Sequence, residues 1–136
     1  MAIQVGDAVA RTFAVDAATM SWFREVAEDS SRIHCDSAYA KARGYADVVV
    51  YGGILMAHLS HLLGMGIPGS NGTSIAWSIK FHEPLYVAEE AQIRLEVTYV
   101  SVATGVVEAK FTVTAGEKRV ASGTTQSLVP LEQIQA

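Results

Sequence analysis

The sequence predicts an α+β fold in which a curved antiparallel sheet is wrapped around one long buried helix. Two observations predict it. The C-terminal half alternates between apolar and polar residues, and the middle of the chain holds a segment that is apolar on almost every side. The chain has 136 residues, so we expect residues 1–136 to form a single domain. Half of the residues are hydrophobic, which is enough for a sizeable core.

The N-terminal part predicts a strand and then a helix. Residues 8–15 (AVARTFAV) are expected to form an edge strand. Asp16 is expected to cap a helix over residues 17–27 (AATMSWFREVA), because an Asp side chain can accept from the free amides of the first turn. Met20 and Phe23 would then lie on one apolar face of this helix.

Two further helices are predicted in the middle of the chain. A short one over residues 37–43 should be capped by Asp36 or Ser37 and end near Gly44. A longer one is predicted over residues 52–66 (GGILMAHLSHLLGMG). Its apolar residues cover most of the circumference: Ile54, Leu55, Met56, Leu59, Leu62 and Leu63. A helix of this kind must be buried, and only the apolar face of the sheet is large enough to cover it.

Three segments of the C-terminal half have the period of two that is typical of antiparallel strands with one dry face. Turns are predicted at residues 103–106 and 115–118, a less regular last strand near 119–128, and a break in the ladder at Pro84. The residues expected on the dry face are Ile75, Trp77, Ile79 and Phe81, then Ile93, Leu95, Val97 and Tyr99, then Val107, Ala109, Phe111 and Val113. A curved antiparallel sheet around one buried helix is the hot-dog fold.

Composition excludes several classes of function. The formal net charge is −4 and no basic run exists, so no nucleic-acid partner is expected. Cys35 is the single cysteine, which excludes an internal disulfide and fits a reducing compartment. We expect neither a signal peptide nor a membrane span, and therefore a cytoplasmic location. His58 and His61 lack a third ligand at a telling spacing, so no metal and no other cofactor is expected.

An acid and a base, Asp29 and His34, lie five residues apart in the stretch EDSSRIHCDS. On a continuous helix they would point about 140° apart. They can converge only if the chain leaves the helix between them, which Ser30 and Ser31 favour. Facing one water, the pair could share its proton and deliver hydroxide. The alternative is that Asp29 caps the end region of a helix and His34 is an ordinary polar loop residue.

Gly52 and Gly53 begin the long helix, whose first amides have no partner inside the helix and lie at the positive end of its dipole. A thioester or other carbonyl oxygen could be polarised there, and glycine would let a ligand approach the backbone closely. The alternative is a tight turn into the helix. Ser60 can either bond back to the carbonyl of Met56 or face a pocket.

The sequence from residue 29 to residue 64 resembles the hydratase motif of the MaoC-like, (R)-specific enoyl-CoA hydratases. The shared pattern is an Asp, four residues, a His, one residue, an Asp and a small helix ending near a Gly. A hydrophobic strand and a Gly-led buried helix follow. The likeness continues through Pro68, Gly69 and the segment SIKFHEPLYVAEE to the final strands.

This resemblance implies a hot-dog homodimer that adds water to a trans-2-enoyl thioester of coenzyme A or of an acyl carrier protein, giving the (R)-3-hydroxyacyl thioester. It implies that Asp29 and His34 are the catalytic pair and that the amide of Gly52 meets the thioester oxygen. Ser60 matches a serine that supports the site. Tyr51 stands where the family often has a His, and it is expected to bind substrate.

Other departures leave alternatives open. Residues 31 and 32 are Ser and Arg where the family often has Asn-Pro, and Arg32 would lower the pKa of Asp29 if it pointed inward. Hot-dog folds also serve thioesterases, which would need a carboxylate aimed at the carbonyl carbon. A third alternative is a non-catalytic partner subunit of a dehydratase. The presence of both Asp29 and His34 favours hydration over these two.

Overall fold

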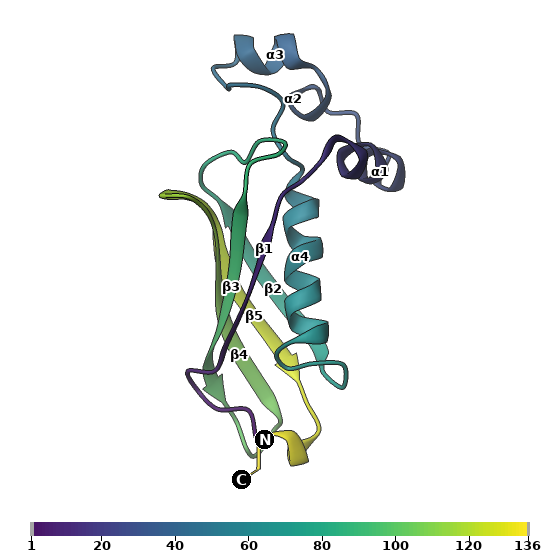
Figure 1. The fold of residues 1–136 in the computed structure, drawn as a ribbon. Helices are drawn as coiled ribbons and strands as arrows, with labels where there is room; N and C mark the ends of the chain where they lie inside the picture. Colours follow the sequence, from purple (N-terminus) through teal and green to yellow (C-terminus); the bar gives the residue numbers. More distant parts are fainter. Residues whose placement is uncertain (1, 136) are drawn as a thin grey trace.

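The computed structural model describes residues 2–135 and consists of an antiparallel sheet, a long helix on one of its faces, and short helices at one end (Figure 1). The elements in chain order are β1 (Ala8–Phe13), α1 (Ala17–Ala27), α2 (Arg32–Cys35), α3 (Ser37–Ala42), α4 (Gly52–Met65), β2 (Thr73–Phe81), β3 (Ala91–Val100), β4 (Val106–Ala115), β5 (Lys118–Leu128) and the 3₁₀ turn η1 (Leu131–Gln133).

The sheet has the strand order β1-β3-β4-β5-β2, and every neighbouring pair is antiparallel. β1 is therefore an edge strand, as predicted, and β2 forms the other edge. α4 runs along one face, α1 to α3 lie together beyond its start, and both termini lie at the opposite end (Figure 1). This is the hot-dog arrangement, so the predicted fold class is confirmed.

Local signals place the helices of the N-terminal half. Asp16 accepts a hydrogen bond from the Thr19 N–H at 2.7 Å, which confirms the predicted cap of α1. Glu28 ends that helix in the left-handed region, with φ 51°. Asp36 accepts from the Tyr39 N–H at 3.0 Å and is thus the cap of α3. These caps satisfy amides that the first helical turns leave without partners.

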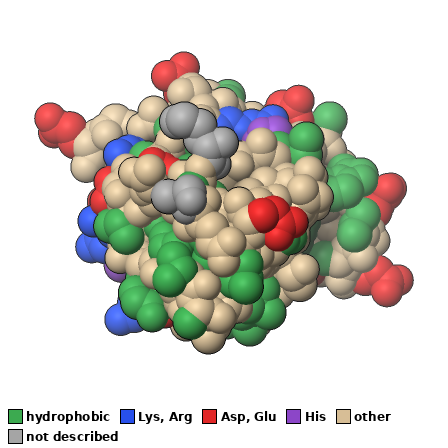
Figure 2. Space-filling view, turned by 90° about the horizontal axis from the view of Figure 1, so that it is seen from below, with side chains coloured by type: hydrophobic (Ala, Val, Ile, Leu, Met, Phe, Trp, Pro, Cys, Tyr) green, Lys and Arg blue, Asp and Glu red, His purple; other side chains and the backbone are tan. Residues whose placement is uncertain are grey.

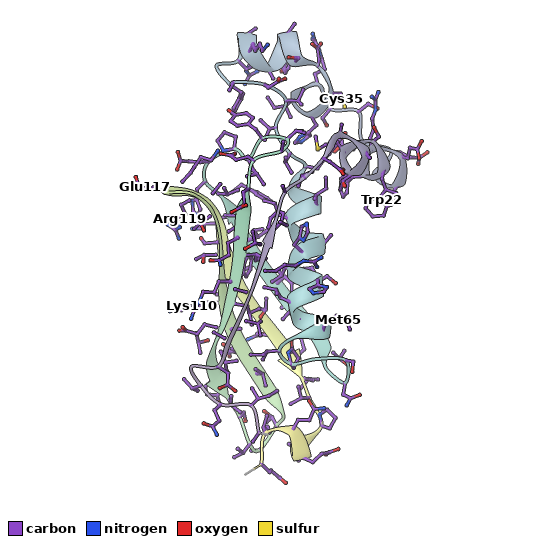
Figure 3. All side chains as sticks on the ribbon, in the orientation of Figure 1. Trp22, Cys35, Met65, Lys110, Glu117 and Arg119 are labelled. Atoms are coloured by element: carbon purple, nitrogen blue, oxygen red, sulfur yellow. The ribbon has the colours of Figure 1, made fainter. Side chains whose placement is uncertain are left out.

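The dry face is formed by the central strands β3 and β4. Their buried residues match the prediction: Ile93, Leu95, Val97, Val107, Ala109, Phe111 and Val113. Tyr99 does not, and the prediction is wrong there because a register shift between Val97 and Tyr99 leaves its side chain 51% exposed. Lys110 lies on the other face and points away from α4 (Figure 3).

The predicted dry face of β2 is wrong for the single chain. Ile75 is 52% and Phe81 57% exposed, while Trp77 and Ile79 are half-buried. β2 pairs with β5 on one side only, and its apolar side chains are left largely uncovered. The alternation therefore predicted a strand correctly but placed its apolar side chains in a core that does not reach the edge.

In the single chain, α4 is covered on its sheet-facing side only. Its buried residues are Ile54, Leu55, Leu59, Leu62 and Leu63. Ala57, Ser60, His61 and Met65 are exposed on the remaining surface. Within residues 2–135, no helix has the length and apolarity required to cross a membrane.

Candidate active site

A cavity of about 390 Å³ lies between α2, the start of α4 and the end of β2. Of the five residues predicted for the site, His34 and Gly52 line this cavity. Asp29, Tyr51 and Ser60 are not among its lining residues. Apolar residues that line it include Ile33, Leu55, Phe81, Leu85 and Val120. The cavity therefore brings an imidazole and a helix N-terminus together against a largely apolar wall.

His34 is held in one tautomer by the backbone. Its Nδ1 lies 2.6 Å from the carbonyl oxygen of Val49. A carbonyl can only accept a hydrogen bond, so Nδ1 carries the proton and donates it. In the neutral imidazole, Nε2 is then left with a lone pair. His34 can therefore accept a proton from a ligand of the cavity through Nε2.

Asp29 lies in the break between two helices, because α1 ends at residue 27 and α2 begins at residue 32. This confirms the predicted departure from helix between Asp29 and His34. Asp29 Oδ1 accepts from the Ser31 N–H at 2.9 Å and from the Ser31 hydroxyl. Among residues 2–135, no donor engages Asp29 Oδ2. One carboxylate oxygen thus fixes the side chain, and the other is available.

Ser31 holds the pKa of Asp29 below its ordinary value, through its hydroxyl and then its N–H; the nearby His34 lowers that pKa further. The hypothesis that Arg32 has this effect is wrong. Arg32 instead pairs with Asp36 at 3.0 Å and lies over the ring of Tyr39 at 4.3 Å. Arg32 thus pairs within the α2–α3 segment, and the pKa of Asp29 is lowered mainly by Ser31, a neutral neighbour.

Tyr51 lies behind the cavity rather than on its surface. Its side chain is 2% exposed, and its hydroxyl donates to the backbone carbonyl of Asp29 at 2.6 Å. Its ring stacks on that of His34 with 4.2 Å between centroids. Burial, together with the neighbouring Cys35 thiol, raises the pKa of the Tyr51 hydroxyl to about 12. This position does not favour the substrate contact predicted for Tyr51.

Gly52 and Gly53 face different surroundings. A Cβ on Gly52 would lie 2.6 Å from Cζ of Phe81, whose ring covers the start of α4 at the cavity. A Cβ on Gly53 would instead overlap the ring of Phe23, which packs against the core. Within the described part of the chain, no acceptor engages the Gly52 N–H. Gly52 is therefore the cavity-facing glycine, and Gly53 is a packing glycine.

Ser60 is not brought to this cavity in the single chain. It is exposed and lies eight residues after Gly52, about 12 Å along the axis of α4. The residues of the cavity wall that sequence reasoning missed include Phe81 and His82. His82 Nε2 lies 2.8 Å from the Ser122 hydroxyl. Pro84 could have indicated both residues, because it marks the end of the strand that follows α4. That strand runs back along α4, so its end lies beside the start of the helix.

The fold and the cavity define a class of protein: a hot-dog domain in which a histidine and the first glycine of the long helix, whose N–H has no acceptor among residues 2–135, line the same pocket. The chain is 29% identical to an (R)-specific enoyl-CoA hydratase of Aeromonas caviae over 96 residues, which cover 71% of this chain and 72% of that protein. No family model matches the sequence.

Solved structures agree with that similarity. The (R)-hydratase from A. caviae involved in PHA biosynthesis superposes with a TM-score of 0.88 at 25% identity, covering 94% of this chain and 98% of the other. An unliganded R-hydratase from Pseudomonas aeruginosa gives a TM-score of 0.85 at 21% identity, covering 94% and 83%. The predicted resemblance to the MaoC-like (R)-specific hydratases is therefore confirmed, and with it the prediction of a hydro-lyase.

The fold by itself is shared more widely. A fluoroacetyl-CoA-specific thioesterase superposes with a TM-score of 0.65 at 13% identity, covering 93% of this chain and 94% of the other. A likeness at this identity concerns the fold alone. The fold alone therefore does not distinguish a hydratase from a thioesterase.

Proposed function

We propose that this protein hydrates a trans-2-enoyl thioester of coenzyme A or of an acyl carrier protein, with Asp29 and His34 activating the water. One observation carries the proposal. His34, with Nδ1 bound to Val49, and Gly52, whose N–H has no acceptor among residues 2–135, line the same cavity. Hydration needs two such groups at the two ends of the enoyl thioester.

The helix end acts on the carbonyl. Water can attack the β-carbon only if negative charge can collect on the thioester oxygen as the new C–O bond forms. The Gly52 N–H lies at the positive end of the α4 dipole and has no protein acceptor among residues 2–135. We assign the thioester oxygen to this donor, because a fixed amide stabilises charge where it develops.

The Asp29 and His34 pair acts on the water. The pKa of Asp29 is lowered, so the carboxylate is ionised at neutral pH and its Oδ2 can accept from the water. Nε2 of His34 can accept the other water proton. The hydroxide then adds to the β-carbon, and the proton removed from water is returned to the α-carbon. The reverse sequence is dehydration.

The (R) configuration of the product rests on the similarity to the (R)-specific enoyl-CoA hydratase of Aeromonas caviae. Chiral chromatography of the hydrated product tests this part, and an (S)-3-hydroxyacyl thioester would contradict it.

We further propose a homodimer. The apolar residues Ile75 and Phe81 on the edge strand β2 and the outward face of α4 are exposed in the single chain. Hydrophobic side chains are also exposed at the end opposite the cavity (Figure 2). Pairing of β2 edges into a continuous sheet would cover the exposed residues of β2, and packing of α4 on α4 would cover the outward face of that helix. A stable monomer in sedimentation at micromolar concentration would contradict the proposal.

The reaction itself is tested with crotonyl-CoA. Loss of the absorbance of the enoyl thioester without release of free thiol is the expected result. Release of thiol at the same rate would identify a thioesterase instead. Binding of crotonyl-CoA without either change would favour a non-catalytic partner subunit. A thiol reagent and the enoyl absorbance, followed in the same sample, separate the three.

A further inference from the structure

Tyr51 contacts three segments that carry the site. Its hydroxyl donates to the Asp29 carbonyl at 2.6 Å, and its ring stacks on His34 at 4.2 Å and 26° between planes. The ring also contacts Phe23 of α1, at 4.8 Å and 40°. Tyr51 itself directly precedes Gly52, the first residue of α4. One buried side chain therefore joins the end of α1, α2 and the start of α4.

The direction of the hydrogen bonds follows from the groups involved. The Tyr51 hydroxyl has one proton, and the Asp29 carbonyl can only accept it. The Cys35 Sγ, 3.3 Å from the same hydroxyl, must then be the donor in that contact. Cys35, the last residue of α2, lies above the start of α4 (Figure 3). The chain of donors runs from Cys35 through Tyr51 to the backbone of Asp29.

The two contacts of Tyr51 restrict different degrees of freedom. The hydroxyl fixes the peptide carbonyl of Asp29, whose side chain Ser31 already holds at Oδ1. The ring face limits rotation of the imidazole of His34, whose Nδ1 is bound to Val49. Because Tyr51 is 2% exposed, these contacts are made away from water. Its high pKa keeps the hydroxyl a donor over the whole working range of pH.

We infer that Tyr51 is a positioning residue that holds Asp29 through its hydroxyl and His34 through its ring, and that it does not bind substrate. This inference rests on the proposed function of the Asp29 and His34 pair. A catalytic group displaced by about 1 Å can lose about 10² in rate, so a side chain that fixes two such groups affects turnover without touching the substrate.

Single substitutions separate the two contacts. Tyr51→Phe removes the hydroxyl and keeps the ring, and we expect kcat to fall about 10-fold with KM unchanged. Tyr51→Leu removes both contacts, and we expect kcat to fall about 10²-fold or more. Tyr86→Phe is the matched control, because the Tyr86 hydroxyl also binds backbone, the Ala46 N–H at 3.0 Å. It should leave kcat unchanged.

Double substitutions show through which group Tyr51 acts. In the Asp29→Asn background, Tyr51→Phe should cause no further loss, because the group that the hydroxyl positions is already inactive. In the His34→Ala background, the difference between Tyr51→Phe and Tyr51→Leu should disappear for the same reason. The inference would be overturned if Tyr51→Phe lowered kcat in the Asp29→Asn background as much as it does in the wild type. It would also be overturned if Tyr51→Phe and Tyr51→Leu still differed in the His34→Ala background, or if Tyr51→Phe alone had wild-type kcat. A rise in KM with unchanged kcat would do so too, since it indicates substrate binding.

A spectroscopic readout separates failure of this inference from failure of the proposed function. The ring of Tyr51 should shift the ring protons of His34 upfield, and Tyr51→Leu should remove that shift. If the shift is seen but Asp29→Asn and His34→Ala hydrate normally, the proposed function fails while the contact stands. If those two variants are inactive but Tyr51→Phe and Tyr51→Leu keep wild-type kcat, only the positioning role fails.

Discussion

The sheet and the helical segment between β1 and α4 are held in different ways. Phe111 and Leu95, on central strands, are at most 2% exposed and pack against α4 and its neighbours. In the helical segment, α1 buries only Met20, α3 buries only Ala40, and α2 buries no residue. Burial holds the first region. In the second, the three helices bury few residues, and directed hydrogen bonds and ring contacts hold the site residues.

The sheet therefore provides most of the stability, while the helical segment carries the proposed catalytic groups. The proposed catalytic groups Asp29 and His34 lie in the helical segment, where their partners are the Ser31 amide and hydroxyl, the Val49 carbonyl and the Tyr51 side chain. Polar groups that must exchange protons with a ligand cannot be buried without loss of that exchange. Substitutions there should therefore change rate more than folding, and substitutions in the sheet should do the reverse.

The largest effect is expected at the catalytic pair. Asp29→Asn and His34→Ala should each reduce hydration by roughly 10²–10⁴-fold, the range for general acid–base groups. Thermal unfolding should change little, because neither side chain fills the core. Steady-state kinetics and a melting curve on the same samples measure both. Near-normal turnover in a folded Asp29→Asn variant would contradict the assignment of Asp29 as a catalytic residue.

The next effect tests the other region. Phe111→Ala should lower the free energy of unfolding by about 3–5 kcal/mol, because it leaves a cavity in the core. Phe81→Ala is the matched control: in a dimer that packs through α4 and leaves the β2 edge exposed, the same change should reduce stability by no more than about 0.5–1 kcal/mol. Denaturant unfolding measures both. Equal losses would mean that β2 is as well covered as β4, as a partner subunit on that edge would cause.

Substitutions of the two glycines at the start of α4 should also differ in this way, with one affecting turnover and the other stability. Gly52→Val should reduce turnover by about 10²-fold, on the scale of a lost oxyanion donor. The free energy of unfolding should change little, since the Phe81 ring that the new side chain meets is exposed and can move. Gly53→Val should destabilise the fold instead, because its side chain meets Phe23 against the core.

A second variant sharpens the reading of Gly52→Val. If the loss came only from the displaced Phe81 ring, Phe81→Ala would restore turnover in the Gly52→Val background. If the Cβ itself keeps the thioester from the amide, the loss remains. In a complex with a substrate-like thioester, an oxygen beyond about 3.5 Å from the Gly52 nitrogen, without a bridging water, would contradict the assigned donor.

The smallest effect concerns the pKa of Asp29. Ser31→Ala removes the hydroxyl that contributes most to lowering it, so the pKa should rise toward its ordinary value of 3.8. Asp29 would then become protonated at a higher pH than in the native protein as the pH falls. Arg32→Ala should leave the pKa unchanged, since Arg32 pairs with Asp36. A carboxyl-carbon NMR titration measures both variants, and the opposite pattern would restore the role first expected of Arg32.

Much of the fold could be predicted from local patterns. The caps Asp16 and Asp36 act within three residues of the amides that they bind, so their signals are complete in the sequence. The break between Asp29 and His34 was also predictable, because Ser30 and Ser31 disfavour a continuous helix there. The identity of the group that lowers the pKa of Asp29 was not, since Ser31 and Arg32 are both near in sequence and only side-chain direction separates them.

By itself, the sequence determined the order of helices and strands and the presence of an acid and a base in one short stretch, because periodicity and capping depend on residues close together along the chain. Only the tertiary structure decided which apolar residues are covered, as the exposed Ile75 on β2 shows. It also decided that Tyr51 lies behind the site and that Phe81 covers Gly52. These contacts join residues 22 and 29 positions apart, and such pairings depend on how the sheet, α4 and the helical segment pack in space.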